Sequence, residues 1–337
     1  MEFLHDLLPL IYTGIIAFGI LMYVWMDGFD LGVGILFNAA PTEADRDLLM
    51  NSIAPVWDGN ETWLVLGGGA LLVAFPMAYS IIMPALYLPF TVMLLGLIFR
   101  GVAFEFRFKA ERGRRFWNLA FGIGSLVAAV SQGIVLGAYL DGITVVNGVF
   151  AGGSFDWLTP FSILTGCAVA CGYALLGATW TAMKTEGALR DWAFGLADRM
   201  CIGVLFFMVA VSIGTAYLSD EIAGRWFSWP NIGWLAPVPV ITALVALLLF
   251  RAVRQRDEIA PFVLTLILFL LGFIGLGVSL WPAIIPPGIT IWQATGDPGS
   301  QTFLLVGVVV LVPCILGYTA MTYWIFRGKV KADGGYH

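Results

Sequence analysis

Residues 9–37 read PLIYTGIIAFGILMYVWMDGFDLGVGILF, and this stretch decides the fold class of the chain. Its only charged residues are Asp27 and Asp30, and it is longer than the roughly 20 apolar residues that an α-helix needs to cross a bilayer. Glu2 and Asp6 precede it, whereas a cleaved signal peptide begins with a basic segment and has a shorter apolar run. We therefore expect a membrane-spanning helix that is retained in the mature protein.

The composition of the whole chain has the same character. Of its 337 residues, 60% are hydrophobic and 12% are charged, whereas about 25% of the residues in an average soluble domain are charged. The mean hydropathy is +0.90, and a soluble monomer of this kind would expose large apolar patches to water. The 17 Lys and Arg are outnumbered by 22 Asp and Glu, which argues against a nucleic-acid partner. An integral membrane protein remains.

Apolar runs of similar length recur along the chain, and they predict nine spans. Only Met77 and Ala78 separate the second span from the third. Fusing these two would give a run of about 45 residues, too long for one crossing, so we expect a tight hairpin there. The sequence thus predicts an all-α integral membrane protein with one polytopic domain over residues 1–337, arranged as two four-helix bundles plus one extra helix. The predicted spans are 9–37, 54–76, 79–99, 116–139, 158–183, 200–218, 234–250, 260–281 and 303–326.

The distribution of Lys and Arg predicts the orientation of these spans. Cytoplasmic loops carry an excess of positive charge. Sixteen of the 17 Lys and Arg follow odd-numbered spans, and only Arg225 lies on the opposite side. We therefore expect the N-terminus outside and the C-terminus in the cytoplasm. The sixteen are Arg46; Arg100, Arg107, Lys109, Arg112, Arg114 and Arg115; Lys184, Arg190 and Arg199; Arg251, Arg254 and Arg256; and Arg327, Lys329 and Lys331.

Glycine and the outer loops indicate how the spans pack. The pairs Gly28 and Gly32, and Gly133 and Gly137, have the spacing that allows close helix contact in lipid. The outer loops 140–157 and 282–301 are long, nearly uncharged and rich in Gly, Pro and Trp. We expect these loops to be lids packed on the outer rim or on a partner.

Histidine and cysteine restrict the chemistry of the chain. His5 and His337 lie at its two ends, so no histidine of the apolar body is placed to hold a haem or a transition metal, and we expect no cofactor or metal ligated by this chain. The cysteines lie inside apolar runs, where a thiol usually packs as a small hydrophobe, and CAVAC lacks the spacing of zinc and redox motifs. We expect no disulfide among Cys167, Cys171, Cys201 and Cys314.

Five carboxylates lie at the cytoplasmic ends of the first three predicted spans. Ionisable groups at membrane depth are costly and mark function by default. Residues three apart share one face of a helix, so three helices are expected to bring carboxylates to the same level on the same side. The five are Asp27 and Asp30 in MDGFDLGVG, Asp58 and Glu61 in WDGNETWLV, and Glu105 in FRGVAFEFR.

Burial disfavours the charged form of a carboxyl, so such groups can take up and release protons near neutral pH. Asp30 and Asp58, deepest in apolar sequence, are predicted to carry protons, as is Glu105. Asp27 and Glu61 are expected nearer the membrane rim, where each could be a solvated or hydrogen-bonded cap.

A structural role for the same acids is the alternative interpretation. They could pair with Arg100 and Arg107, or with a partner subunit, and only stabilise the packing. The middle of the membrane is nearly free of charge, whereas a transporter with alternating access would need polar sites there. The pattern therefore favours a path from the cytoplasm to a buried terminus. Because this chain lacks ligands for a redox centre that could consume the protons, we expect that terminus to belong to another polypeptide.

Four ordered motifs resemble subunit II of the cytochrome bd family of quinol oxidases: MDGFDLGVGIL, NSIAPVWDGNETWLV, FRGVAFEFR, and the tail GITIWQAT with YTAMTYWIFRGKV. The resemblance runs from the first span to the last. It implies a nine-helix subunit in the bacterial cytoplasmic (inner) membrane, paired with a homologous subunit I and with small single-helix accessory subunits as possible further partners. Subunit I of that family carries haem b, haem d and the quinol site, and the complex reduces oxygen to water with protons from the cytoplasm.

In that family, acids of subunit II are assigned to a proton channel, and the matching positions are Asp30, Asp58 and Glu105. The third position is often Asp, so Glu keeps the charge on a longer side chain. The compact length of the chain favours the cyanide-insensitive branch of that family. Three hypotheses remain: an oxidase subunit that conducts protons, a purely structural assembly subunit, and an independent proton-coupled transporter.

Overall fold

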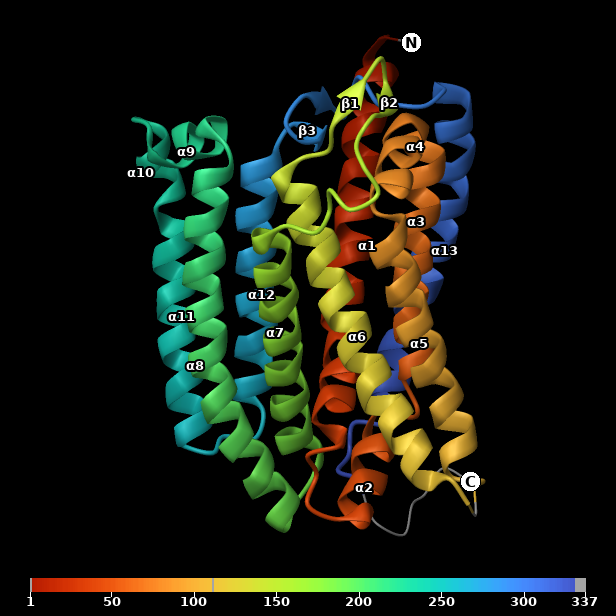
Figure 1. Ribbon diagram of the computed structural model, residues 1–337, viewed down its shortest axis with the longest axis vertical. Coiled ribbons are helices and arrows are strands. Elements are labelled where there is room, and N and C mark those ends of the chain that lie inside the picture. The colour runs from red at the N-terminus through yellow and green to blue at the C-terminus, as the bar shows by residue number, and fades with distance from the viewer. Residues whose placement is uncertain (1, 111, 331–337) are drawn as a thin grey trace.

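The computed structural model describes residues 2–110 and 112–330, with side chains from residue 7 onward. The long helices of this part of the chain run side by side along one axis (Figure 1). In the first half are α1 (Glu2–Phe37), α2 (Glu43–Ile53), α3 (Trp57–Ala74), α4 (Pro76–Ala85), α5 (Tyr87–Arg107), α6 (Arg114–Asp141), β1 (Val145–Val146) and β2 (Val149–Phe150). In the second half are α7 (Pro160–Lys184), α8 (Gly187–Leu218), α9 (Asp220–Phe227), α10 (Asn231–Leu235), α11 (Pro237–Arg254), α12 (Ala260–Leu280), β3 (Ala283–Ile285), β4 (Ile289–Thr290) and α13 (Pro298–Ile325).

Eight helical segments of the described chain are long and apolar enough to cross a membrane. They are α1, α5, α6, α7, α8, α11 together with α10, α12 and α13. Helix α3 packs beside α1 but is not among them, because its 18 residues include Asp58, Asn60 and Glu61. The predicted class, an all-α membrane protein, is confirmed. The predicted count of nine spans requires that α3 also crosses the membrane.

The tight hairpin expected between the second and third spans is wrong. Pro76 starts the separate helix α4, because proline is favoured in the first turn of a helix and cannot extend an existing one. Helix α5 then begins at Tyr87 instead of residue 79 and continues to Arg107. Arg100 and Glu105 were expected beyond the end of the third span, and both lie inside this helix.

The sixth span is longer than predicted. Helix α8 begins at Gly187 instead of residue 200, so Arg190 and Arg199 lie in a helix and not in a loop. Arg190 donates to Glu258, in the turn between α11 and α12, at 3.0 Å. This contact joins the start of α8 to the neighbouring turn at one end of the bundle.

Helix α1 packs against α3, α6 and α7, and its glycines make this possible. A Cβ atom on Gly32 would lie 1.8 Å from the carbonyl oxygen of Tyr173 on α7, and one on Gly133 of α6 would lie 2.4 Å from that of Thr165. No larger residue fits at either position, which confirms the predicted role of these glycines in close packing. On the other side of α7, helices α8, α11 and α12 stand together (Figure 1).

The two long loops at the end of the bundle near the N-terminus form short antiparallel hairpins, β1 with β2 and β3 with β4 (Figure 1). Ile143, Ile285 and Ile291 from these loops are buried in one apolar cluster with residues of α1 and α4. The backbone N–H of Gly296 donates to the carbonyl oxygen of Ala74 at 2.9 Å. The loops therefore pack on the rim of the bundle, as predicted for 140–157 and 282–301.

Candidate functional site

Arg100 of α5 is the centre of a buried polar cluster, and its side chain has 0% exposure. Its Nη1 donates to Oδ1 of Asp27 at 2.8 Å and to Oε1 of Glu61 at 2.9 Å. Its Nη2 lies 3.9 Å from Oδ2 of Asp30. The carboxylates come from α1 and α3, so three helices meet at one guanidinium. We call these four residues the Arg100 cluster.

Helix geometry explains why these side chains meet. Asp27 and Asp30 are three residues apart and share one face of α1. Helices α5 and α6 approach closely at Gly96 and Gly124, where a Cβ atom on Gly96 would lie 2.7 Å from the carbonyl oxygen of Gly124. Arg100 is one turn after Gly96 on the same face. The close contact therefore turns the arginine into the bundle.

Asp30 is held by an amide and not by the arginine. Nδ2 of Asn60 donates to Oδ2 of Asp30 at 2.6 Å and to the carbonyl oxygen of Met26 at 3.3 Å. The hydroxyl of Tyr323 on α13 donates to Oδ1 of Asn60 at 3.0 Å. Because a carbonyl only accepts, the contact with Met26 fixes which end of the amide faces Asp30. Helix α13 is thereby connected to the cluster.

A second polar chain lies on the side of α6 and α7. Tyr23 is one turn before Asp27 on α1, and its hydroxyl accepts from Nε2 of Gln132 at 2.7 Å. Oε1 of Gln132 accepts from the hydroxyl of Tyr173 at 2.8 Å. Our sequence interpretation missed these three residues. The available signal was an amide in the middle of an apolar span, which is costly unless it has partners.

A group of aromatic side chains next to Asp30 on α1 extends to α2. Phe29 stacks on Trp180 with 4.1 Å between ring centroids, and Phe262 and Tyr323 meet Phe29 edge-on. Nε1 of Trp180 donates to the hydroxyl of Ser52 on α2 at 3.3 Å.

Within the Arg100 cluster, only the side chain of Glu61 is partly exposed, at 28%. The side chains of the other three residues have 0% exposure.

The structure brings Asp27, Asp30, Glu61 and Arg100 together, but it does not bring in Asp58 or Glu105. The side chain of Asp58 is exposed, one turn before Glu61 on α3. The side chain of Glu105 is 68% exposed and pairs with Lys109 at 3.3 Å.

The expected depths of Asp58 and Asp27 were therefore wrong, since Asp58 is exposed and Asp27 is fully buried. Asp30 is buried, Glu61 is partly exposed, and Glu105 is exposed near the end of α5. Each helical residue turns the chain by about 100°, so Glu105 points about 140° away from Arg100. An apolar sequence context does not distinguish the buried face of such a helix from the face that meets lipid or a partner.

Arg107 does not pair with any of the predicted site acids. Its Nη1 lies 2.6 Å from Oδ1 of Asp47 and its Nη2 lies 3.3 Å from Oε2 of Glu43, both on α2. Its Nε donates to Oδ1 of Asn118 on α6 at 2.6 Å. Arg107 thus holds α2 against α5 and α6. Our sequence interpretation did not identify Glu43 and Asp47. Both follow Thr42, whose capping box with Asp45 begins α2 and can be recognised in the sequence as a helix-start signal.

Metal ligation has no candidate among the residues that the structure describes, because no group of three or more His, Cys, Asp or Glu is arranged to hold an ion. The side chain of His5 and the whole of His337 lie outside the described part. The four cysteines are free, with Cys201 buried and Cys167 and Cys314 exposed.

The fold and the cluster define an all-helical membrane protein whose conspicuous polar feature is a set of carboxylates gathered around one buried arginine. The chain belongs to the cytochrome bd terminal oxidase subunit II family, whose model matches residues 8–326. The resemblance expected from the four motifs is therefore confirmed.

Known relatives and a solved structure agree with this family. The cytochrome bd-I ubiquinol oxidase subunit 2 of Escherichia coli (strain K12) is 28% identical over 366 residues, which cover 98% of this chain and 97% of the relative. The cytochrome bd ubiquinol oxidase subunit 2 of Bacillus subtilis (strain 168) is 28% identical over 345 residues, with 98% of each chain covered. A chain of the bd oxidase structure from Geobacillus thermodenitrificans superposes with a TM-score of 0.76 at 19% identity, covering 96% of this chain and 99% of that one. That similarity supports the fold.

Proposed function

We propose that this chain is subunit II of a membrane-bound quinol:oxygen oxidoreductase in the inner membrane of a bacterium. It pairs with a homologous subunit I that holds haem b and haem d and oxidises quinol, and small single-helix subunits are further candidate partners. Family membership and similarity over 98% of the chain to a ubiquinol oxidase subunit 2 support this proposal. Reduction of oxygen to water by the complex consumes protons from the cytoplasm.

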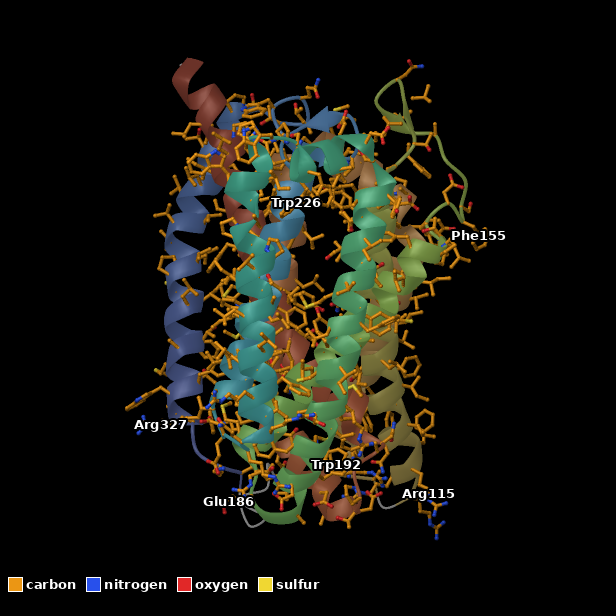
Figure 2. The ribbon with its side chains drawn as sticks, turned by 90° about the vertical axis from the view of Figure 1, so that its left-hand side faces the viewer. Arg115, Phe155, Glu186, Trp192, Trp226 and Arg327 are labelled. Carbon is orange, nitrogen blue, oxygen red and sulfur yellow. The ribbon has the colours of Figure 1, made fainter. Side chains whose placement is uncertain are left out.

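Nine spans are proposed, with α3 as the ninth. Figure 2 shows Arg115, Glu186 and Arg327 at one end of the molecule and Phe155 and Trp226 toward the other. Because positive charge marks the cytoplasmic side, the first end is assigned to the cytoplasm and the N-terminus to the outside. We group α1, α3, α5 and α6 as one four-helix bundle and α7, α8, α11 and α12 as the other, with α13 as the extra helix of a single polytopic domain.

Proton uptake is the role that we assign to the carboxylates. The observation that carries it is the Arg100 cluster, in which Glu61 alone is partly exposed while Asp30 is fully buried. In this proposal Asp58 and Glu105, whose side chains are exposed, collect protons at the surface. Carboxyl groups at hydrogen-bonding distances from fixed partners are suited to proton transfer. The proposed order is Asp58, then Glu61, then Asp30.

Asp27 has a different role in this proposal. At 2.8 Å from Arg100 and with 0% exposure, it is the fixed counter-charge of the arginine. The structural alternative explains the same contact, since a buried ion pair also holds helices together. The transporter alternative needs a polar pathway to the outer end. Beyond Tyr23, Gln132 and Tyr173, the described contacts there are mostly apolar, which does not favour it.

The experiment is Glu61→Gln in the complete oxidase. The amide keeps the shape and a hydrogen bond to Arg100 but carries no exchangeable acid proton. If Glu61 relays protons, the complex assembles with its normal haem spectrum while quinol-driven oxygen consumption falls by about 100-fold. Asp58→Asn is also expected to lower quinol-driven oxygen consumption while the haem spectrum stays normal.

The matched control is Glu186→Gln, which removes an exposed acid at the same end of the molecule (Figure 2) and is expected to leave oxygen consumption unchanged. Parallel loss of haem content, yield and activity in Glu61→Gln would favour the structural subunit. A purified preparation without haem b and haem d would favour the transporter.

A further inference from the structure

The Arg100 cluster contains more carboxyl groups than cations. Asp27 and Asp30 of α1 and Glu61 of α3 face Arg100 of α5. Among the described residues, Arg100 is the one cation within 4.0 Å of these carboxylates. If all three acids were ionised, the cluster would have a net charge of minus two.

The hydrogen bonds of Arg100 are not shared equally among the three acids. Its Nη1 donates to Asp27 and to Glu61, whereas Asp30 has no hydrogen bond from the guanidinium. The donor to Asp30 is the neutral amide of Asn60, and Oδ1 of Asp30, like Oδ2 of Asp27, is buried without a partner. Asp30 is therefore the acid with the weakest support for a negative charge.

The other groups around Asp30 do not supply that support. Tyr323 of α13 is neutral and directs its hydroxyl to Asn60. Tyr23 and Tyr173, from α1 and α7, are neutral and bonded to Gln132. Exposed Asp58 adds a further negative charge on α3, beside Glu61. Every charged neighbour except Arg100 thus opposes ionisation of Asp30.

Burying a carboxylate that accepts no hydrogen bond from a cation is costly, and a nearby like charge adds to the cost. A group in this position keeps its proton instead. We propose that Asp30 is a neutral carboxylic acid at neutral pH and stores one proton inside the subunit. This inference rests on the proposed proton path and names its storage site.

The geometry also assigns the oxygen that carries the proton. The contact with Met26 fixes Nδ2 of Asn60 toward Asp30, so Oδ2 of Asp30 is an acceptor. Oδ1 has no partner and is the oxygen that bears the hydrogen. On release, this O–H bond breaks, the proton is consumed in the reduction of oxygen to water by the complex, and Asp30 becomes a carboxylate 3.9 Å from Arg100. Uptake of one proton through Glu61 restores the acid, and no electron is exchanged.

Infrared spectroscopy of the complete oxidase tests the stored proton, because a protonated carboxyl has a C=O stretch that an ionised carboxylate lacks and that shifts in D₂O. Asp30→Asn is expected to lose one protonated carboxyl per complex at pH 7. Glu186→Gln, which removes an exposed acid outside the cluster, is the matched control and is expected to lose none. An unchanged band area in assembled Asp30→Asn would overturn the inference.

Tyr323→Phe keeps the test decisive if Asp30→Asn does not assemble. It removes the hydroxyl that polarises Asn60, so the C=O band of Asp30 is expected to shift in frequency and keep its area. No shift in that variant would overturn the inference.

Oxygen consumption by the Asp30→Asn complex distinguishes the inference of a stored proton from the proposed path of proton uptake. Loss of the band with full activity in Asp30→Asn supports storage and overturns the path. Loss of activity with the band intact supports the path and overturns storage.

Discussion

Arg100→Met tests whether the cluster joins α1, α3 and α5. Methionine fills a similar volume without charge, so the packing of the site changes little while both bonds from Nη1 are lost. The substitution leaves Asp27, with 0% exposure, without its partner. Glu61 also loses its bond, but at 28% exposure it keeps some access to solvent.

The magnitude follows from the burial of the pair. Breaking a buried ion pair by removing one partner costs about 3–5 kcal/mol of folding free energy. In an Asp27→Asn background no buried charge is left unpaired at this position, so the cost of Arg100→Met is expected to fall by about 2–3 kcal/mol, the upper range of coupling between contacting residues.

The assay is a double-mutant cycle on the purified complex, with unfolding followed during SDS titration. Glu105→Gln near the end of α5 and Lys109→Met in the turn that follows it supply a control cycle, because that pair is exposed at 68% and 78%. An exposed pair of this spacing is expected to couple by only about 0.3–0.5 kcal/mol. Costs at Asp27 and Arg100 that add within about 0.5 kcal/mol would refute the reasoning.

Three further predictions follow from packing, charge and topology. Gly32→Val is expected to prevent assembly because its Cβ would lie 1.8 Å from a carbonyl oxygen, while Gly14→Ala, which meets nothing within 4 Å, is expected to leave the yield of folded complex unchanged. The hydrogen bond from Lys329 lowers the pKa of Glu258. The stabilisation that this contact gives to the tail at 326–330 is therefore complete above the ordinary pKa of Glu, and it is lost as pH falls through the lowered pKa. Hydrogen exchange of the tail is expected to accelerate in that acidic range, and in Glu258→Gln already at pH 7. Tags after α5 and at the C-terminus are expected to react only from the cytoplasm and one in the β1–β2 hairpin only from outside, and a cytoplasmic hairpin would exclude nine spans.

Part of the site could be predicted from the sequence, because an ionisable residue within a membrane span indicates function by its residue type alone. A carboxylate in an apolar run is costly wherever the helix points, so Asp27, Asp30 and Glu61 were recognisable as candidates. Their depth was not, because rotation of α3 and α5 about their axes depends on contacts such as Gly96 with Gly124, whose partners are far apart in sequence. The roles of Asn60 and Gln132 as connectors likewise follow from neighbouring helices.

The membrane class and most of the long helices follow from the sequence by itself, because apolar length and the side on which positive charge accumulates are properties of consecutive residues. Helix α4 was missed because a proline can either end one helix or begin the next, and neighbouring contacts decide which. Only the tertiary structure decided that Arg100 faces inward to two carboxylates, that Arg107 binds α2 instead, and that Asp30 is left with an amide. The physical reason is that hydrophobicity acts residue by residue, whereas the pairing of buried charges depends on which helix faces are brought within about 3 Å of each other.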